Sequence, residues 1–170
     1  MTSIHKANMK FLLSIALTLA TLTSMAQDGK ALTVKKTFSR STAVSIQIDA
    51  SPEVVWALLT NAESFPKWNS TVISIDGKIE LGEKIKLVAA IAPDRTFKIQ
   101  IKDMQPHQSM VWGDSMGKRT FTLEAKNGGT YFTMYEKIGN PMFPLFANKI
   151  PDFDEAFEQY AADLKVAAEK

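Results

Sequence analysis

The chain has 170 residues, the size of one domain, and contains no cysteine. The lack of cysteine excludes disulfides, thiolate nucleophiles, cysteine-based metal sites and lipid attachment through an N-terminal cysteine. The net charge is +2 over the whole chain, but this value includes a segment that we expect to be removed.

The first 26 residues predict a signal peptide. Two lysines precede the apolar run 11–22, and small residues stand at Ser24 and Ala26, where a signal peptidase cleaves. Twelve helical residues span about 18 Å, whereas a hydrocarbon core is about 30 Å thick, which argues against an uncleaved anchor. We therefore expect cleavage after Ala26, one mature domain over residues 27–170 without a stable membrane anchor, and a secreted or periplasmic location.

Removal of residues 1–26 would lower the net charge of the chain from +2 to zero. Two of the 20 basic side chains lie within this segment, which leaves 18 basic against 18 acidic side chains. A balanced charge gives no reason to expect nucleic acid as a partner.

The mature chain opens with a predicted strand over Thr33–Ile48, because apolar residues alternate with polar ones towards its end. Two short helices are predicted next. Ser51 is placed as an N-cap, and Pro52 suits the first helical position. The stretch Phe65–Asn69 closes the second short helical turn.

Six further strands follow, separated by turn residues. Tight turns between short strands indicate an antiparallel meander, and the alternation indicates that one face is buried. The alternating positions expected on the buried face are Thr71, Ile73 and Ile75; Ile85, Leu87, Ala89 and Ile91; Phe97, Ile99 and Ile101; Met110 and Trp112; Phe121, Leu123 and Ala125; and Phe132 and Met134.

A long helix is predicted at the C-terminus. Asp152 followed by Glu155 is typical of a capping box. Apolar residues then recur at helical spacing, at Phe153, Phe157, Tyr160, Ala161, Leu164 and Ala168. The apolar stretch Met142–Ile150 is interpreted either as a separate short helix or as the first part of a helix kinked at Pro151.

The stretch IDASPEVVWALLTNAESFPKWN (residues 48–69) and Gly128-Gly129-Thr130 resemble the SRPBCC superfamily of polyketide cyclase/dehydrase and START-like proteins. The resemblance covers roughly Thr33–Lys170. It implies an α+β helix-grip fold, in which a curved antiparallel seven-stranded sheet wraps around a long C-terminal helix, with two short helices after the first strand. It also implies an apolar cavity between the sheet and that helix.

The residues expected to face this cavity are mostly apolar, which suits a small hydrophobic molecule. For any single one of them, packing in an ordinary core is the more frequent role. They are Leu87, Ala89, Phe97, Ile99, Met110, Trp112, Phe121, Leu123, Met134, Phe157 and Tyr160, with Phe65 and Trp68 expected near the mouth.

Three polar residues are candidates for catalysis. Glu136 and Asp114 share the parity of apolar neighbours on their strands, and Tyr160 lies on the apolar stripe of the last helix. A carboxylate against an apolar wall can act as a general acid or base, but strand ends are also commonly solvated. His107 is the sole histidine after residue 26, so we expect no metal site and no cofactor.

Three functions are compatible with these observations. The first is an exported protein that binds a small hydrophobic ligand, such as a lipid, an isoprenoid or an aromatic compound. The second is a cyclase/dehydrase-type enzyme. The third is an interaction module of the cell envelope, for which an exposed apolar patch around Met142–Ile150 would argue. We favour the first because the inward residues are apolar and no catalytic cluster stands out.

Overall fold

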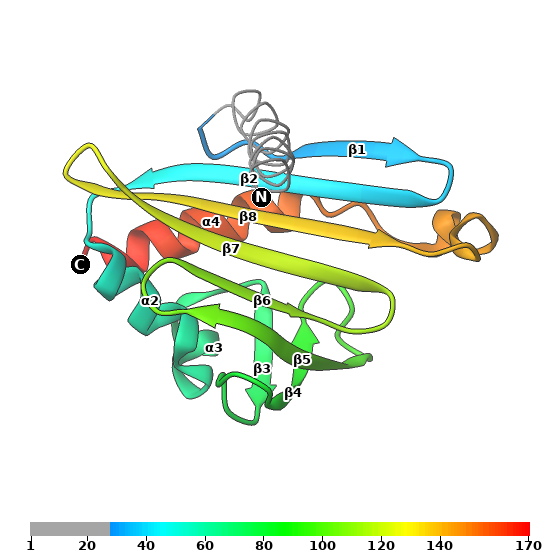
Figure 1. Cartoon of the computed structure of the whole chain (residues 1–170), viewed down its shortest axis with the longest axis horizontal. Helices are drawn as coiled ribbons and strands as arrows, with labels where there is room; N and C mark the ends of the chain where they lie inside the picture. The colour runs from blue at the N-terminus through cyan, green and yellow to red at the C-terminus, as the bar shows by residue number, and fades with distance from the viewer. Residues whose placement is uncertain (1–27) are drawn as a thin grey trace, which may run out of the picture.

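The computed structural model describes residues 28–170, and the predicted signal peptide 1–26 lies outside the described residues. The fold is α+β, with one antiparallel sheet of eight strands in the order β1-β2-β8-β7-β6-β5-β4-β3 (Figure 1). The strands are β1 (Leu32–Lys36), β2 (Ser39–Ile48), β3 (Val72–Asp76), β4 (Lys84–Ala89), β5 (Thr96–Gln105), β6 (Ser109–Gly113), β7 (Gly117–Lys126) and β8 (Gly129–Gly139).

The sheet has eight strands rather than the predicted seven, because Thr33–Ile48 forms a hairpin. Residues 37 and 38 make the turn, and β1 runs back along β2 from the pair Lys36 and Ser39. Neither turn residue is Gly, Pro, Asn or Asp, so the sequence carries no turn signal there. The second strand of this hairpin pairs with the last strand of the chain, from Ser39 opposite Gly139 to Ile48 opposite Thr130.

The helices after β2 are α2 (Pro52–Thr60), the 3-10 helix η1 (Ala62–Ser64) and α3 (Phe65–Trp68). Ser51 has the extended backbone of an N-cap, and Pro52 occupies the first turn of α2. Asn61 ends α2, and its side chain accepts a hydrogen bond from the backbone N–H of Ser64 at 3.2 Å. The predicted pair of short helices is therefore present.

The stretch Met142–Ile150 is separate from the C-terminal helix. It holds the 3-10 helices η2 (Phe143–Leu145) and η3 (Ala147–Lys149), and α4 (Asp154–Ala168) follows after Pro151. The predicted capping box does not form, because the N-cap is Phe153. The Asp152 carboxylate still accepts a hydrogen bond from the backbone N–H of Asp154, at 3.1 Å.

The strand β3 departs from simple alternation. Its pairing with β4 shifts between Val72 and Ser74, as at a β-bulge. The bulge turns Val72 and Ile75 inward and leaves Ile73 48% exposed, so the predicted inward face at Ile73 is wrong.

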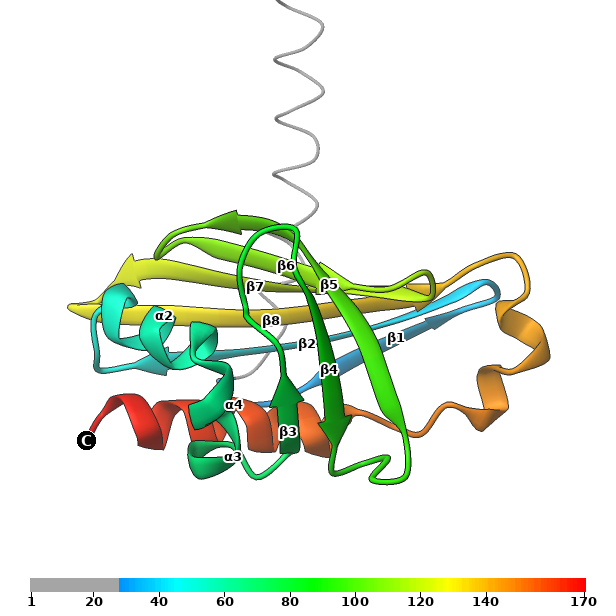
Figure 2. The same ribbon diagram turned by 90° about the horizontal axis from the view of Figure 1, so that it is seen from below.

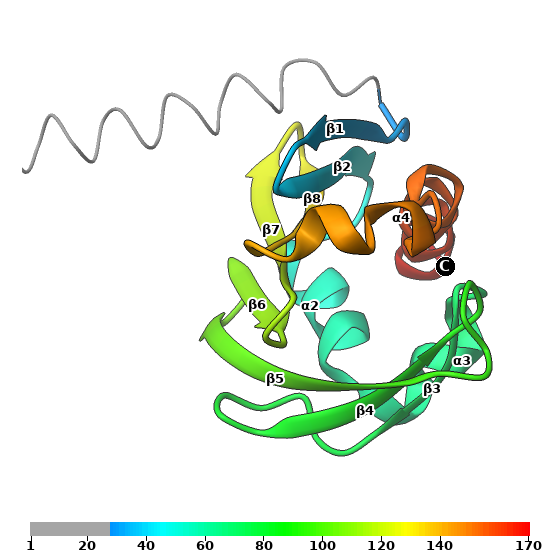
Figure 3. The ribbon, with the colours of Figure 1, turned by 90° about the vertical axis from the view of Figure 1, so that its right-hand side faces the viewer.

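The sheet curves, and α4 lies on its concave side, as the end-on view in Figure 3 shows. The view in Figure 2 shows α2 and α3 beside α4 on the same side of the sheet. The predicted apolar stripe of α4 faces this core, because Phe157, Tyr160, Ala161 and Leu164 are buried. In the part of the chain that the structure describes, no helix is long and apolar enough to cross a membrane.

Candidate ligand pocket

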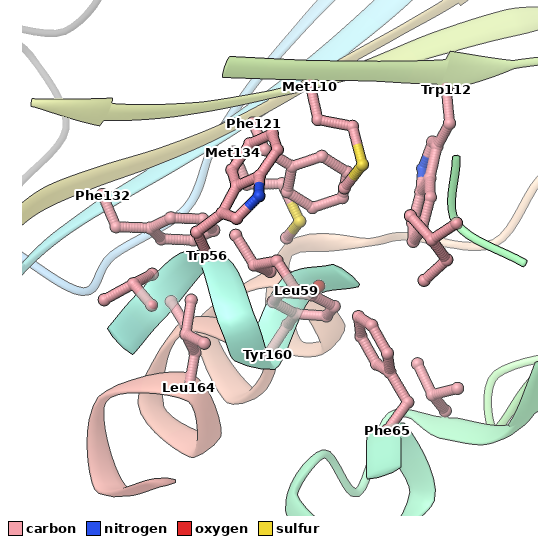
Figure 4. Packing of buried hydrophobic residues seen from close by; sticks show 14 of the residues in the cluster. Trp56, Leu59, Phe65, Met110, Trp112, Phe121, Phe132, Met134, Tyr160 and Leu164 are labelled. Atoms are coloured by element: carbon pink, nitrogen blue, oxygen red, sulfur yellow. The ribbon is translucent and has the colours of Figure 1, made fainter. Parts of the chain in front are cut away.

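Aromatic rings fill one part of the space between the sheet and α4. Figure 4 shows Phe121, Phe132 and Tyr160 gathered there, with Phe65 close by. The Tyr160 ring centroid lies 6.0 Å from that of Phe121, 6.4 Å from that of Phe132 and 6.3 Å from that of Phe65. This part of the interior is a packed core.

The remaining space is a pocket of about 610 Å³. Its walls come from the start of β3, from β4 and β5, from the ends of β6 and β7, from β8, from η3 and from the first two turns of α4. Leu87 and Phe97 lie on the strand side, and Phe157 lies on the helix side. Phe146 and Ile150, which follow β8, complete the wall. The volume falls in the range of about 300–1,000 Å³ that is common for small-molecule sites.

Eight of the thirteen residues that the sequence placed on a cavity wall line this pocket. They are Leu87, Ala89, Phe97, Ile99, Trp112, Met134, Phe157 and Tyr160. The other five lie elsewhere: Met110, Phe121 and Leu123 belong to the packed core, and so do Phe65 and Trp68, which were expected at the mouth. Phe65 and Trp68 are not at the mouth because α3 packs against β3 and α4 and carries both rings inward, where their centroids lie 4.7 Å apart with the ring planes tilted by 40°.

The polar centre of the pocket is an ion pair between Arg119 on β7 and Glu136 on β8. These residues are directly opposite each other in the strand pairing. Nε and Nη2 of Arg119 both donate to Oε2 of Glu136, at 2.9 and 2.5 Å. The two side chains are only 21% and 17% exposed. The prediction that Glu136 faces inward therefore agrees with its position among the lining residues.

The Arg119 side chain is fixed on a second side by an aromatic ring. Its Cζ lies 5.0 Å from the centroid of Phe157, an arrangement in which the ring face attracts the cation. Arg119 was not among the site residues predicted from the sequence. It shares the parity of the buried residues Phe121 and Leu123 on the same strand, and that parity is the signal that would have revealed it.

Asp114 lines the pocket, but its carboxylate holds a turn. Its Oδ1 accepts hydrogen bonds from the backbone N–H groups of Met116 at 2.7 Å and Gly117 at 3.0 Å, between β6 and β7. The Asp114 carboxylate therefore stabilises this turn at the rim of the pocket.

Tyr160 reaches the pocket with its ring, while its hydroxyl is enclosed. The residue is 1% exposed, and its hydroxyl has no hydrogen-bond partner within residues 28–170. Burial raises the pKa of Tyr160 far above its usual range, and the Arg119 cation offsets this only in part. The phenol therefore stays protonated at physiological pH.

No group of three or more His, Asp or Glu side chains that could hold a metal ion is found between residues 28 and 170. The absence of a cofactor stays a prediction from the sequence.

The segment η2–η3, defined as residues 142–150, faces both the pocket and the solvent. Phe146 and Ile150 line the pocket, and Phe143 is buried. Met142 and Leu145 on its other side are 59% and 72% exposed. An apolar surface therefore lies next to the pocket wall.

The sequence profile of one protein family, described as "Activator of Hsp90 ATPase homolog 1-like protein", matches residues 49–169. No curated protein matches the sequence.

Solved structures share the fold at low sequence identity. A conserved protein of unknown function from Enterococcus faecalis has a TM-score of 0.61 and 16% identity, over 83% of this chain and 78% of that chain. The Aha1 dimer from Colwellia psychrerythraea has a TM-score of 0.59 and 20% identity, over 76% and 96%. A Mesorhizobium loti protein has a TM-score of 0.59 and 20% identity, over 75% and 96%.

Proposed function

Because the chain belongs to the family of Activator of Hsp90 ATPase homolog 1-like proteins, which is of the SRPBCC type, we propose that it binds a small hydrophobic molecule between the sheet and α4. Folds of this type commonly bind hydrophobic ligands.

The observation that carries the proposal is the pocket of about 610 Å³ with mostly apolar walls. Unfilled apolar space costs dispersion energy that close packing would recover, so its presence beside a well-packed aromatic core is a reason to expect an occupant. Isoprenoids, acyl chains and aromatic compounds match this lining.

The test uses a substitution on α4 that places a large side chain in the pocket. Ala156 on α4 lines the pocket, whereas Ala162 on the same helix is exposed. We expect Ala156→Phe to abolish binding of an uncharged apolar dye, N-phenyl-1-naphthylamine, and Ala162→Phe to leave it unchanged. Native mass spectrometry of the wild-type protein, with solvent extraction, would identify a bound molecule. Equal dye binding by the two variants would refute the proposal.

The geometry favours binding over cyclase/dehydrase-type catalysis. Of the three candidate residues, Asp114 holds a turn and the Tyr160 hydroxyl is enclosed, which leaves only Glu136, paired with Arg119 through one of its two oxygens. A general acid or base must reach the proton that it transfers. Loss of turnover on a genuine substrate in Glu136→Gln would instead support the enzyme.

A second candidate function is that of an interaction module of the cell envelope, favoured by the exposed Met142 and Leu145. Apolar side chains that protrude together mark contact surfaces. The test measures, by sedimentation, vesicle binding and self-association of the wild-type protein and of the double variant Met142→Asp/Leu145→Asp. A monomer that binds neither would remove it.

Export is part of the proposal and is supported by the sequence of residues 1–26. We expect the protein purified from its host to begin at Gln27, as read by intact mass. Replacement of Ala26 by Arg should block cleavage and keep the longer chain. A wild-type protein that starts at Met1 would refute the expectation.

A further inference from the structure

The ion pair in the pocket does not use all of its hydrogen-bonding capacity. Both bonds from Arg119 end on Oε2 of Glu136. Within residues 28–170, Oε1 of Glu136 and Nη1 of Arg119 take part in no hydrogen bond. A carboxylate oxygen is an acceptor and a guanidinium nitrogen is a donor. Oε1 of Glu136 and three N–H bonds of Arg119, two on Nη1 and one on Nη2, therefore remain free on the same pair, in the pocket wall.

The charge at this point is balanced, which restricts what can bind there. A ligand carboxylate would gain from Arg119 but would be repelled by Glu136, and an ammonium group would meet the reverse. Either would also lose its hydration in an apolar pocket, which is costly for a charge without its own counter-ion. A neutral group that donates to Oε1 and accepts from a free N–H of the guanidinium gains hydrogen bonds from both side chains and adds no charge.

From this geometry we propose that the pocket selects an apolar molecule with one neutral polar end that both donates and accepts a hydrogen bond. A hydroxyl or a primary amide has this chemistry. The inference rests on the proposed function and specifies its ligand class. The apolar body would lie against Leu87, Phe97 and Phe157, and the polar end would lie at Arg119 and Glu136.

Of the other charged residues that line the pocket, Asp114 is bonded within its turn, and the cations Arg95 and Lys149 define the rival ligand. Arg95 and Lys149 are exposed, and the Arg95 Cζ lies 4.6 Å from the Phe97 ring centroid. Two cations at the rim would favour a ligand whose carboxylate stays at the entrance. The relative affinity of a carboxylate and an alcohol of the same chain length shows whether the polar end of the ligand lies at Arg119 and Glu136 or at the entrance.

The test compares four ten-carbon ligands at pH 7.5: decan-1-ol, decanamide, decanoate and decylammonium. Each displaces bound N-phenyl-1-naphthylamine from the wild-type protein. We expect the alcohol and the amide to bind at least about tenfold more tightly than the two ions. Decanoate binding as tightly as the alcohol, or more tightly, would overturn the inference and leave the proposed function standing. Failure of the dye and of all four ligands to bind would refute the proposed function itself.

Variants of the pair make a sharper prediction about its role. Glu136→Gln leaves Arg119 without a counter-ion, so decanoate should become the preferred ligand. Arg119→Gln should shift the preference towards decylammonium. Lys118→Gln/Lys137→Gln is the matched control, because these residues are opposite each other in the same two strands, are exposed, and do not line the pocket. An unchanged ranking in folded Glu136→Gln would overturn the inference. If a variant fails to fold, the order of affinity of the four ligands for the wild-type protein is sufficient to test the inference.

Discussion

Replacement of Tyr160 by Phe should stabilise the protein. The ring is packed among Phe65, Phe121 and Phe132, so the phenylalanine keeps these contacts. The change removes a buried hydroxyl that has no partner within residues 28–170. A tyrosine beside a pocket is usually read as a functional group, so a gain in stability would be informative.

The magnitude follows from two opposing contributions. A buried hydroxyl without a hydrogen bond costs about 1–3 kcal/mol. Deletion of one oxygen atom loses several dispersion contacts of about 0.1–0.2 kcal/mol each. The net expectation is a gain of about 1–2 kcal/mol in the free energy of unfolding, or a rise in Tm of about 2–4 °C for each kcal/mol.

Urea denaturation measures this gain, with fluorescence of the three tryptophans as the signal. Tyr135→Phe is the matched control, because Tyr135 is only half-buried on β8. Its unfolding midpoint should stay within about 0.5 kcal/mol of the wild type. A loss of 1 kcal/mol or more in Tyr160→Phe would refute the reasoning, because it would mean that the hydroxyl has a partner.

The same substitution should change the response to alkaline pH. Burial raises the pKa of Tyr160 above the ordinary value of 10.0, so the folded state keeps its proton while the unfolded state loses it. Stability from this group is complete below pH 10 and falls as the pH rises above it. The wild type should lose up to about 1.4 kcal/mol per pH unit more than Tyr160→Phe. Parallel pH profiles of the two proteins would contradict this expectation.

Three further predictions concern the core and the C-terminal segment. Leu164→Ala, at a fully buried site on α4, should cost about 2–5 kcal/mol in urea denaturation, whereas Val166→Ala on its exposed face should cost under about 0.5 kcal/mol. Nη2 of the buried Arg40 donates a hydrogen bond to the Pro151 carbonyl at 2.6 Å. Arg40→Met should therefore lower the free energy of unfolding by about 1–3 kcal/mol and speed proteolysis after residue 140. Unchanged proteolysis would argue against this contact. Hydrogen bonds from Lys30 and from the backbone N–H of Ala31 hold the pKa of Glu158 below its ordinary value of 4.5. The stabilisation from this group is therefore present above pH 4.5 and is lost as the pH falls. Glu158→Gln should lose less stability on acidification, as followed by circular dichroism, and identical acid profiles of the two proteins would contradict this.

Periodicity predicted most of the fold because burial on one face leaves a direct mark on the sequence. The alternation at Ile85 and Leu87 and the helical spacing from Phe157 to Leu164 both correspond to buried residues. The failures occur where the chain departs from a regular period. Ile73 points outward because of a bulge, and no residue type marks a bulge reliably.

The pocket was less predictable than the fold. Alternation identifies the inward face of a strand, but it does not say which inward residues touch one another. Met134 lines the pocket, whereas Phe121, opposite it in the strand pairing, belongs to the packed core. That difference depends on where α3 and α4 lie over the sheet. Arg119 was missed because a charge is usually assigned to the solvent, although its parity with Phe121 was visible.

The pairing of β2 with β8 has a consequence for synthesis. The ladder joins Ser39–Ile48 to Thr130–Gly139, so about ninety residues must be made before β2 meets its partner. Until Thr130–Gly139 has been made and can pair with it, the ten-residue strand Ser39–Ile48 has hydrogen-bonding groups free along one edge. A chain of this topology cannot complete its sheet gradually from the N-terminus. It closes the sheet late, and chains cut before β8 are expected to aggregate.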